Sequence, residues 1–333
     1  MKKIGFCILS GLILLFIILL TGCGGVPPIS IYRYIFVADG SNGLVVIDMS
    51  DLNNPVQISG FDLDNAVDIY IQDIYAFVAD SNNGIVILDT NDRNNITEKS
   101  TFSFNSNDPR RIFVKEISGK RYAFIANGYD LRLLDVSDPS NPVEKYIPDI
   151  YTITTNVFVD ENNYLYVTDM IEGLKVINAQ NPEFTLFQGE ISINGAYSVY
   201  VSGNYAYVAS TSEGLVIVDV SNPANPSEVT SISGNFCCVT GKDNYVFVSG
   251  ADGLYIVDVS NPQNPQVVYS DPQIFGLDLF AGESLYVAAG TNGVLCYDIQ
   301  DPTNPALISN FNTDGYANGI FVMEIHQLFL NRK

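Results

Sequence analysis

The chain has few of the residues on which enzymes and nucleic-acid-binding proteins most often depend. Among its 333 residues there are one histidine and no tryptophan, and 16 Lys and Arg stand against 37 Asp and Glu, for a formal net charge of −21. The single histidine, His326, argues strongly against a Ser-His-Asp triad, a histidine general base and a histidine metal site. Nucleic acid is not expected as a partner, because phosphate binding needs clustered Lys and Arg. The acidic excess favours cations or basic partners instead.

Cysteine is scarce as well, and its spacing does not suggest a zinc site. Beyond the first 23 residues the chain has only Cys237, Cys238 and Cys296. No pair of them has zinc-ligand spacing, so we interpret all three as small buried hydrophobic residues. Cys237 and Cys238 are adjacent in a predicted strand and should point to opposite faces. No glycine-rich loop follows a strand and opens a helix, so nothing supports nucleotide binding.

The N-terminus resembles an export signal. Met1-Lys2-Lys3 precedes an apolar run over residues 4–20, and Leu20-Thr21-Gly22-Cys23 follows. We predict a secretory signal over residues 1–22. The tetrad resembles a bacterial lipobox, which implies cleavage before Cys23 and a lipid on that residue. The resemblance implies anchoring in the outer membrane of a Gram-negative cell, or in the outer leaflet of the cytoplasmic membrane of a Gram-positive one. A plain membrane span of about 17 residues is the alternative, but it leaves the small-small-Cys ending unexplained.

One phrase, a strand followed by a turn, recurs along the rest of the chain. It reads G-L-V-I-V-D-V-S-N-P-A-N-P at residues 214–226, and it returns at residues 43–55, 253–265 and 293–305, with weaker copies from Gly84, Asp130 and Gly173. The apolar residues suit a buried strand, and Ser-Asn-Pro suits a turn. The residues that end the seven strands are 41, 46, 43, 41, 39 and 40 residues apart. A period near 40 predicts a β-propeller.

The predicted architecture is therefore one all-β domain over residues 32–333, a seven-bladed propeller of four-stranded antiparallel blades. The repeat resembles the LVIVD repeat family of bacterial and archaeal surface proteins over roughly residues 32–323. The resemblance implies a propeller exported to the cell surface, and it brings no established activity with it.

The two ends of the propeller sequence are complementary. With the strands of a blade lettered A to D from the inside outwards, the first repeat begins with a B strand at Tyr34 and lacks an A strand. The C-terminus ends with an A strand over residues 319–323, which we expect to complete that first blade and close the ring. Residues 328–330 resemble the start of another B strand. Cys23 and the Gly/Pro-rich residues up to 31 are expected to form a short tether.

Two sets of acidic residues fall at different places in the repeat. The first ends each C strand, where a carboxylate or amide accepts hydrogen bonds from its own turn. We interpret it as structural, and its members are Asp48, Asp89, Asp135, Asn178, Asp219, Asp258 and Asp298.

The second set lies in B–C and D–A loops, which emerge on the same side of a propeller. The B–C members are Asp39, Asp80, Asp130, Asp169, Glu172, Glu213 and Asp252. The D–A members are Asp62, Asp64, Asp108, Asp149, Asp271 and Asp314. Four aromatic residues share these loops, namely Tyr151, Phe236, Phe275 and Tyr316. Any one of these residues is explained by the polarity of loops. Together they predict a negative face that binds a cation, a glycan or a basic protein.

The predicted function is a lipid-anchored cell-surface binding module that works through this acidic face. No catalytic residue is identified. The first alternative is a hydrolase or lactonase in which calcium, bound by carboxylates as a cofactor, activates water. The second alternative is a structural envelope component without a specific ligand. The tether enters at the start of a B strand, which lies on the face of the A–B and C–D loops. We therefore expect that face to lie towards the membrane and the acidic face to point outwards.

Overall fold

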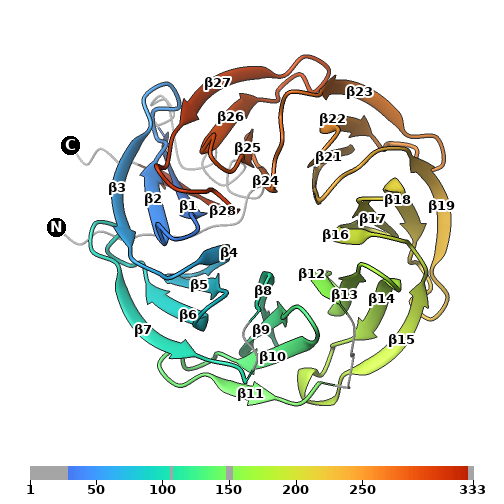
Figure 1. Ribbon diagram of the computed structural model, residues 1–333, viewed down its shortest axis with the longest axis horizontal. Helices are drawn as coiled ribbons and strands as arrows, with labels where there is room; N and C mark the ends of the chain where they lie inside the picture. Colours follow the sequence, from blue (N-terminus) through green and yellow to red (C-terminus); the bar gives the residue numbers. More distant parts are fainter. Residues whose placement is uncertain (1–28, 106–107, 148–152, 329–333) are drawn as a thin grey trace, which may run out of the picture.

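Each copy of the repeated phrase forms the third strand of a four-stranded antiparallel sheet. The structure, a computed structural model, describes residues 29–105, 108–147 and 153–328. Within them, seven such sheets stand as blades around a central axis (Figure 1). The predicted seven-bladed propeller is confirmed. No helix in the described part of the chain has the length and apolar character of a membrane span.

Blade 1 combines the two ends of the described chain, and the other blades follow in sequence order. In the order A to D, blades 1 to 3 consist of β28 (Gly319–Leu328), β1 (Ile29–Ala38), β2 (Leu44–Asp48) and β3 (Val56–Phe61); β4 (Ala66–Gln72), β5 (Tyr75–Asp80), β6 (Gly84–Asp89) and β7 (Thr97–Phe102); and β8 (Arg111–Ile117), β9 (Lys120–Ala126), β10 (Leu131–Asp135) and β11 (Val143–Lys145).

Blades 4 to 7 repeat the pattern, and blade 4 adds the short 3₁₀ helix η1 (Pro182–Phe184). Their strands are β12 (Thr154–Val159), β13 (Tyr164–Asp169), β14 (Gly173–Asn178) and β15 (Leu186–Ile191); β16 (Ala196–Ser202), β17 (Tyr205–Ser210), β18 (Gly214–Asp219) and β19 (Ser227–Ile232); β20 (Cys238–Lys242), β21 (Tyr245–Gly250), β22 (Gly253–Asp258) and β23 (Gln266–Asp271); and β24 (Asp278–Ala281), β25 (Ser284–Ala288), β26 (Val294–Asp298) and β27 (Ala306–Phe311).

The core consists of apolar layers between neighbouring blades. One layer joins Phe36 and Val46 of blade 1 to Ile69 and Val78 of blade 2. A middle strand is therefore covered on both faces, and every residue of β18 before Asp219 is buried. This explains why the repeat has four apolar residues in a row instead of an alternating pattern, because neither face of the strand meets water.

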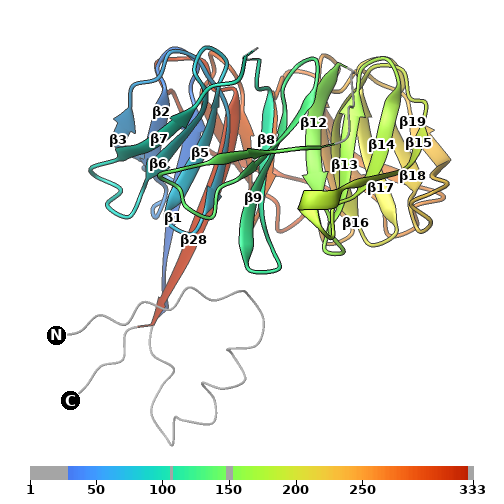
Figure 2. The same cartoon turned by 90° about the horizontal axis from the view of Figure 1, so that it is seen from below.

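The closure of blade 1 is longer than the sequence predicts. β1 and β28 face each other over ten residue pairs, from Ile29 and Leu328 to Ala38 and Gly319. Their outer ends project beyond the disk on the side of the A–B and C–D loops (Figure 2). The expected tether is thus strand from Ile29 onwards, and Leu328 still belongs to β28 instead of starting a B strand. Cys23 and the predicted signal segment lie outside the described residues.

Candidate functional site

The B–C and D–A loops meet on one face of the disk, which we call the acidic face. The opposite face, with the A–B and C–D loops, is called the ribbon face after β1 and β28. Asp80 illustrates how the loops of the acidic face are held. Its two carboxylate oxygens accept four backbone N–H groups at 2.9–3.2 Å, from Asn82 and Asn83 in its own loop and from Asp64 and Asn65 in the D–A loop.

Three B–C aspartates expected on the surface are buried, so the sequence prediction is corrected for Asp39, Asp80 and Asp169. Asp39 accepts hydrogen bonds from Thr313 Oγ1 at 2.6 Å and Asn42 Nδ2 at 2.8 Å. Burial raises its pKa. Asp169 accepts the N–H groups of its own turn. These carboxylates organise the loops and are not available to a ligand.

Three other predicted acids are in ion pairs. Asp130 pairs with Arg132 at 2.6 Å, Asp108 with Arg110 at 2.9 Å, and Glu172 with Lys175 at 2.7 Å. A seventh residue, Asp271, is half-buried and accepts the N–H of Gln273 at 2.9 Å. Arg110 neutralises Asp108, whereas Arg132 is shared by Asp130 and Glu144, and Lys175 by Glu172 and Glu190, so these cations reduce the negative charge of the face only in part.

The remaining five described acids are exposed, and none forms an ion pair with a described residue. They are Asp62, Asp64, Glu213, Asp252 and Asp314. Glu213 and Asp252 each accept one backbone N–H, from Asn194 at 2.7 Å and Asn235 at 2.9 Å. An exposed carboxylate with one such bond keeps its charge and a free oxygen. These five residues are named the rim carboxylates.

The predicted aromatic residues separate into exposed and buried ones. Phe275 and Tyr316 are 45% and 44% exposed, as expected for a contact surface. Phe236 is fully buried and packs edge-on against Tyr255 at 5.0 Å, so its expected exposure is wrong. Phe236 precedes β20 at the position that Ala196 occupies in blade 5. The side chain at this position is buried in the core, so the ring of Phe236 is buried as well. Asp149 and Tyr151 lie outside the described residues.

Two exposed apolar side chains of this face were not predicted. Tyr129 and Ile171, both in B–C loops, are 67% and 68% exposed. Their loops were assigned by acidic residues alone, so the adjacent apolar side chains were overlooked. They widen the apolar part of the rim that Phe275 and Tyr316 begin.

The turn residues at the ends of the C strands have the predicted role. Each accepts the N–H of the residue two positions later at 2.8–3.1 Å, and the set is Asp48, Asp89, Asp135, Asn178, Asp219, Asp258 and Asp298. Three residues further on, a second acceptor repeats the same turn; these residues are Asp51, Asp92, Asp138, Asn181, Asn222, Asn261 and Asp301. The second set was missed, although its fixed spacing was visible in the repeat.

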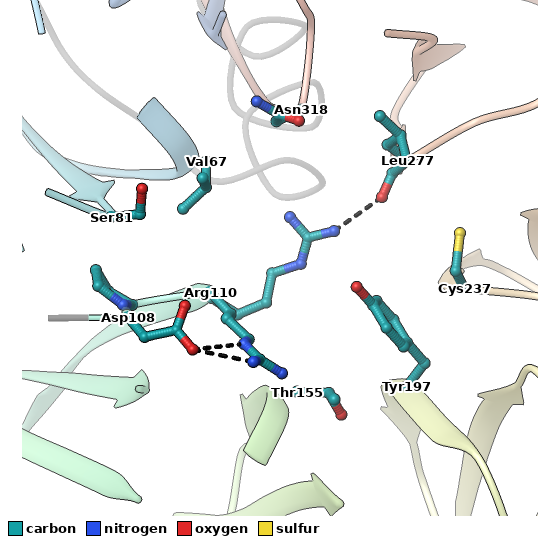
Figure 3. Close-up of a pocket in the computed structure, with 11 residues that line it drawn as sticks. Val67, Ser81, Asp108, Arg110, Thr155, Tyr197, Cys237, Leu277 and Asn318 are labelled. Atoms are coloured by element: carbon teal, nitrogen blue, oxygen red, sulfur yellow. Dashed lines mark hydrogen bonds and ion pairs between the residues drawn. The ribbon is translucent and has the colours of Figure 1, made fainter. Parts of the chain in front are cut away.

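A cavity of about 250 Å³ opens where the central channel reaches the acidic face, and we call it the cup. Its wall takes one position from the start of each inner strand, and Asp108 and Ser81 extend it towards the loops (Figure 3). The equivalent positions around the ring are Val67, Arg110, Thr155, Tyr197, Cys237, Leu277 and Asn318. The wall is therefore chemically different in every direction, as a binding site for an asymmetric ligand requires.

Arg111 lies beside the cup as part of a buried ion network. Its guanidinium donates to Asp68 Oδ1 at 3.2 Å and Leu277 O at 2.8 Å, and Asp278 Oδ1 is 3.8 Å away. The carboxylates also accept N–H groups from neighbouring blades, those of Ile112 at 2.7 Å and Ile320 at 2.9 Å. Burial raises the pKa of Asp68 to about 7 despite Arg111, and it raises that of Asp278 as well. One buried cation thus ties three blades together.

Further down the channel, six of the seven inner strands contribute an aromatic ring. Neighbouring rings have centroids 5.0–5.7 Å apart, and the series runs Phe280, Phe321, Tyr70, Phe113, Phe158 and Tyr200. Aromatic pairs at these spacings are attractive. The polar cup therefore lies over an apolar, aromatic section of the channel, which favours ligands that stay near the mouth.

The cysteines differ from the prediction in one respect. Cys238 and Cys296 are buried and Cys237 is half-buried. Cys237 and Cys238 do not point to opposite faces, because their Sγ atoms lie 3.5 and 3.3 Å from the same oxygen, Gly276 O. Among the described residues, no group of three or more His, Cys, Asp or Glu side chains is arranged to hold a metal ion.

Comparison with known families agrees with the repeat. The LVIVD repeat model matches residues 29–62, 65–103, 116–149, 195–233, 230–270 and 281–313, which together are more than half of the chain. The chain belongs to the LVIVD repeat family. The family model leaves out residues 150–194, where the weak copy of the phrase that starts at Gly173 still forms a strand of blade 4. Among curated proteins, none matches this sequence.

Solved structures with the same fold include two described as lactonases. A protein from Lactobacillus plantarum superposes with a TM-score of 0.74 at 12% identity, covering 88% of this chain and 99% of its own. A putative 6-phosphogluconolactonase from Bacteroides fragilis superposes with a TM-score of 0.72 at 13% identity, covering 88% of this chain and 98% of its own. For the periplasmic gluconolactonase PpgL of Pseudomonas aeruginosa the TM-score is 0.71 at 12% identity, and the superposition covers 89% of this chain and 99% of that protein. At such low identity these similarities establish the fold alone.

Proposed function

We propose that this LVIVD repeat propeller is a lipid-anchored binding module of the cell envelope, and that its acidic face binds a basic partner. One observation carries the proposal. The rim carboxylates are exposed and lack cationic partners among the described residues, whereas every cation that the structure describes near them is already paired with a carboxylate. A surface with that imbalance attracts positive charge.

The distribution of basic residues supports the same choice of face. On the ribbon face, Arg33, Lys120 and Arg121 are paired with Glu283, Glu183 and Asp73, while acids such as Asp51 and Asp92 have no ion pair with a described residue. Two exposed aromatic residues, Phe275 and Tyr316, lie on the acidic face close to the rim carboxylates, and the ribbon face has an exposed Phe184. Aromatic faces beside carboxylates suit the side chains of Lys and Arg.

The lipid anchor is inferred from the sequence of residues 20–23, and the position of β1 fits it. Ile29 stands at the outer end of the ribbon, on the ribbon face (Figure 2). A lipid on Cys23 is six residues away, which allows roughly 20 Å of extended chain. A chain anchored there directs the ribbon face to the membrane and the acidic face outwards.

A direct test uses a soluble chain that starts at Gly24 and so keeps every residue that the structure describes. Its binding to immobilised poly-L-lysine is compared between two fivefold variants of equal charge. The first replaces the rim carboxylates (Asp62→Asn, Asp64→Asn, Glu213→Gln, Asp252→Asn and Asp314→Asn). The second replaces ribbon-face acids (Asp51→Asn, Asp92→Asn, Glu116→Gln, Glu161→Gln and Asp243→Asn).

We expect the rim variant to bind about tenfold more weakly or worse, because a focused field acts locally, and the control variant to bind nearly as the unmodified chain does. Equal loss in both variants would mean that net charge alone is responsible, and it would favour a structural envelope component. The same three chains then serve to retrieve partners from envelope extract, where a partner must be lost with the rim variant only.

An enzyme of the lactonase kind is the second candidate, on a different observation. Asp68, whose pKa is raised to about 7 by burial, lies against Arg111 beside a cavity at the channel mouth. A carboxyl that titrates near neutrality suits general acid–base chemistry. Hydrolysis of glucono-δ-lactone with and without calcium, lost in Asp68→Asn while poly-L-lysine binding is retained, would establish it. Equal hydrolysis rates for the two chains would eliminate it.

A further inference from the structure

Two adjacent thiols lie on the wall of the cup, and no part of the proposed function uses them. Cys237 lines the cavity between Tyr197 and Leu277 (Figure 3). Cys238, the next residue, is buried behind it. Both Sγ atoms lie within 3.5 Å of Gly276 O, so the two sulfur atoms converge on one point.

A bulge at the start of the inner strand explains the convergence. In β4, β12 and β16 the pairing with the second strand shifts register by one residue, between Ala66 and Asp68 in the first case. In blade 6, Cys237 donates its N–H to Ser249 O at 2.9 Å, and Cys238 also faces Ser249. Two residues then oppose one, and successive side chains no longer alternate.

The shared acceptor is held in place by its own contacts. Ser249 Oγ accepts the N–H of Gly276 at 2.9 Å and donates to Ile274 O at 3.2 Å. A Cβ on residue 276 would lie 2.7 Å from Val287 Cγ1, so only glycine lets the loop approach this closely. The carbonyl therefore stands at a fixed place beside both thiols.

The charges around the pair favour a reactive outer thiol. The hydrogen bond with Cys238 and the positive charge of Arg111 lower the pKa of Cys237, although burial and the charge of Asp278 oppose this, and burial raises the pKa of Cys238. Arg111 is close because it donates to Leu277 O, the carbonyl that follows Gly276. Thiolate is the form that binds thiophilic ions.

We propose that Cys237 and Cys238 form a bidentate dithiol site for thiophilic ions that enter through the cup, with trivalent arsenic as the representative ligand. Two convergent sulfur atoms can bind one soft atom, and the buried position of Cys238 excludes a second protein molecule from the complex. The site is independent of the rim carboxylates and of the proposed basic partner.

The binding reaction balances without an oxidant. With phenylarsine oxide as the probe, two S–H bonds and the arsenic–oxygen bond break, and two As–S bonds form. The two thiol protons leave with the oxide oxygen as one water molecule. Arsenic stays trivalent, and both sulfur atoms keep their oxidation state.

The test reduces the soluble chain from Gly24 with a phosphine, adds phenylarsine oxide, removes the excess and measures the intact mass. We expect one phenylarsenic group on the unmodified chain and on Cys296→Ala, the matched control for a buried thiol elsewhere. A dithiol competitor should remove the group, whereas a monothiol at the same thiol concentration should not. Cys237→Ser should carry no adduct, and its half-buried position at the cup makes this variant the more tolerant one.

Two results would overturn the proposal. The first is an adduct that persists in Cys237→Ser or in Cys238→Ala, because bidentate binding needs both sulfur atoms. The second is an unmodified chain that gains no phenylarsenic group while Cys237 is alkylated by iodoacetamide, since the thiol is then accessible without acting as half of a pair. The rim variant should bind the probe as the unmodified chain does.

Discussion

The two faces of the disk use aspartate in different ways. On the ribbon face, the aspartate that ends a C strand is partly exposed and holds only its own turn, as Asp219 does through Ser221. On the acidic face, Asp80 is fully buried and holds two loops through four N–H groups. The residue type and its repeat spacing are the same. Burial and the number of donors decide whether a carboxylate is a local cap or a joint between loops.

The faces also differ in how their charges are balanced. The acidic face places Arg111 inside the channel with Asp68 and Asp278, so this cation contributes nothing to the outer rim. The ribbon face keeps cations such as Lys120 exposed beside their partners. Removing a buried charge and removing an exposed one should therefore have very different consequences, which the following substitutions measure.

The largest expected effect is that of Arg111→Met at pH 8. The buried Asp68 and the half-buried Asp278 then lose their common cation, which costs about 3–5 kcal/mol in the free energy of unfolding. Denaturant unfolding measures it. The control Lys120→Met removes an exposed cation and should leave the unfolding curve unchanged. If the triple variant Arg111→Met, Asp68→Asn, Asp278→Asn is no more stable than Arg111→Met, unpaired charge is not the cause of the loss.

The next effect compares the two kinds of aspartate directly. Asp80→Ala leaves four partly buried N–H groups without their acceptor and should cost about 2–4 kcal/mol. Asp219→Ala removes a partly exposed cap and should cost about 0.5–1 kcal/mol. Thermal or denaturant unfolding of both variants measures the two losses in the free energy of unfolding. Similar losses for the two would show that the B–C aspartate does no more than cap a turn.

A third effect depends on pH. The pKa of Asp68 is raised to about 7 by burial, whereas an unfolded chain has an aspartate pKa near 3.9. Between these values the folded chain binds the additional proton, so its stability is greatest at low pH and falls as the pH rises through 7, by at most about 1.4 kcal/mol per pH unit. Asp68→Asn should flatten this part of the stability curve. Hydrogen bonds to Ser221 lower the pKa of Asp219, so its protonation changes the folding stability only below about pH 4. Asp219→Asn therefore serves as the control.

The smallest effect concerns orientation. In blade 5, Ser212 in the B–C loop and Asn204 in the A–B loop are both exposed and lie on opposite faces. In a lipid-bearing chain on liposomes, a bulky maleimide should label Ser212→Cys faster than Asn204→Cys by a few-fold, because the proposed orientation places the ribbon face nearer the bilayer. Without liposomes the two rates should be alike. Faster labelling of Asn204→Cys would reverse the proposed orientation.

The repeat made most of the fold predictable. Strand positions, blade number and ring closure follow from a phrase whose period and apolar run have one architectural solution. The turn role of residues such as Asp219 followed too, since a cap depends only on its own neighbours. Blade 4 was predicted from Gly173 and its weak copy of the phrase, because the apolar spacing persists where the wording does not.

The cup was not predictable in the same way. Asp68, Arg111 and Asp278 are 43 and 167 residues apart in the sequence and meet only because their strands all begin at the channel. Burial of Asp39 and Phe236 likewise depends on neighbouring loops that no local pattern describes. One signal was available, since the charged residues at the start of these inner strands stand out against the uncharged residues at the same position in the other blades, such as Ser198 and Cys238.

The ribbon of β1 and β28 also determines how the molecule carries mechanical load. A pull on the chain ahead of Ile29 acts along β1, while the hydrogen bonds to β28 and β2 run across it. The load is therefore shared in shear by many bonds at once and does not open them one after another. A propeller fastened through its first strand is thus attached where the load is divided between two neighbouring strands, β28 and β2.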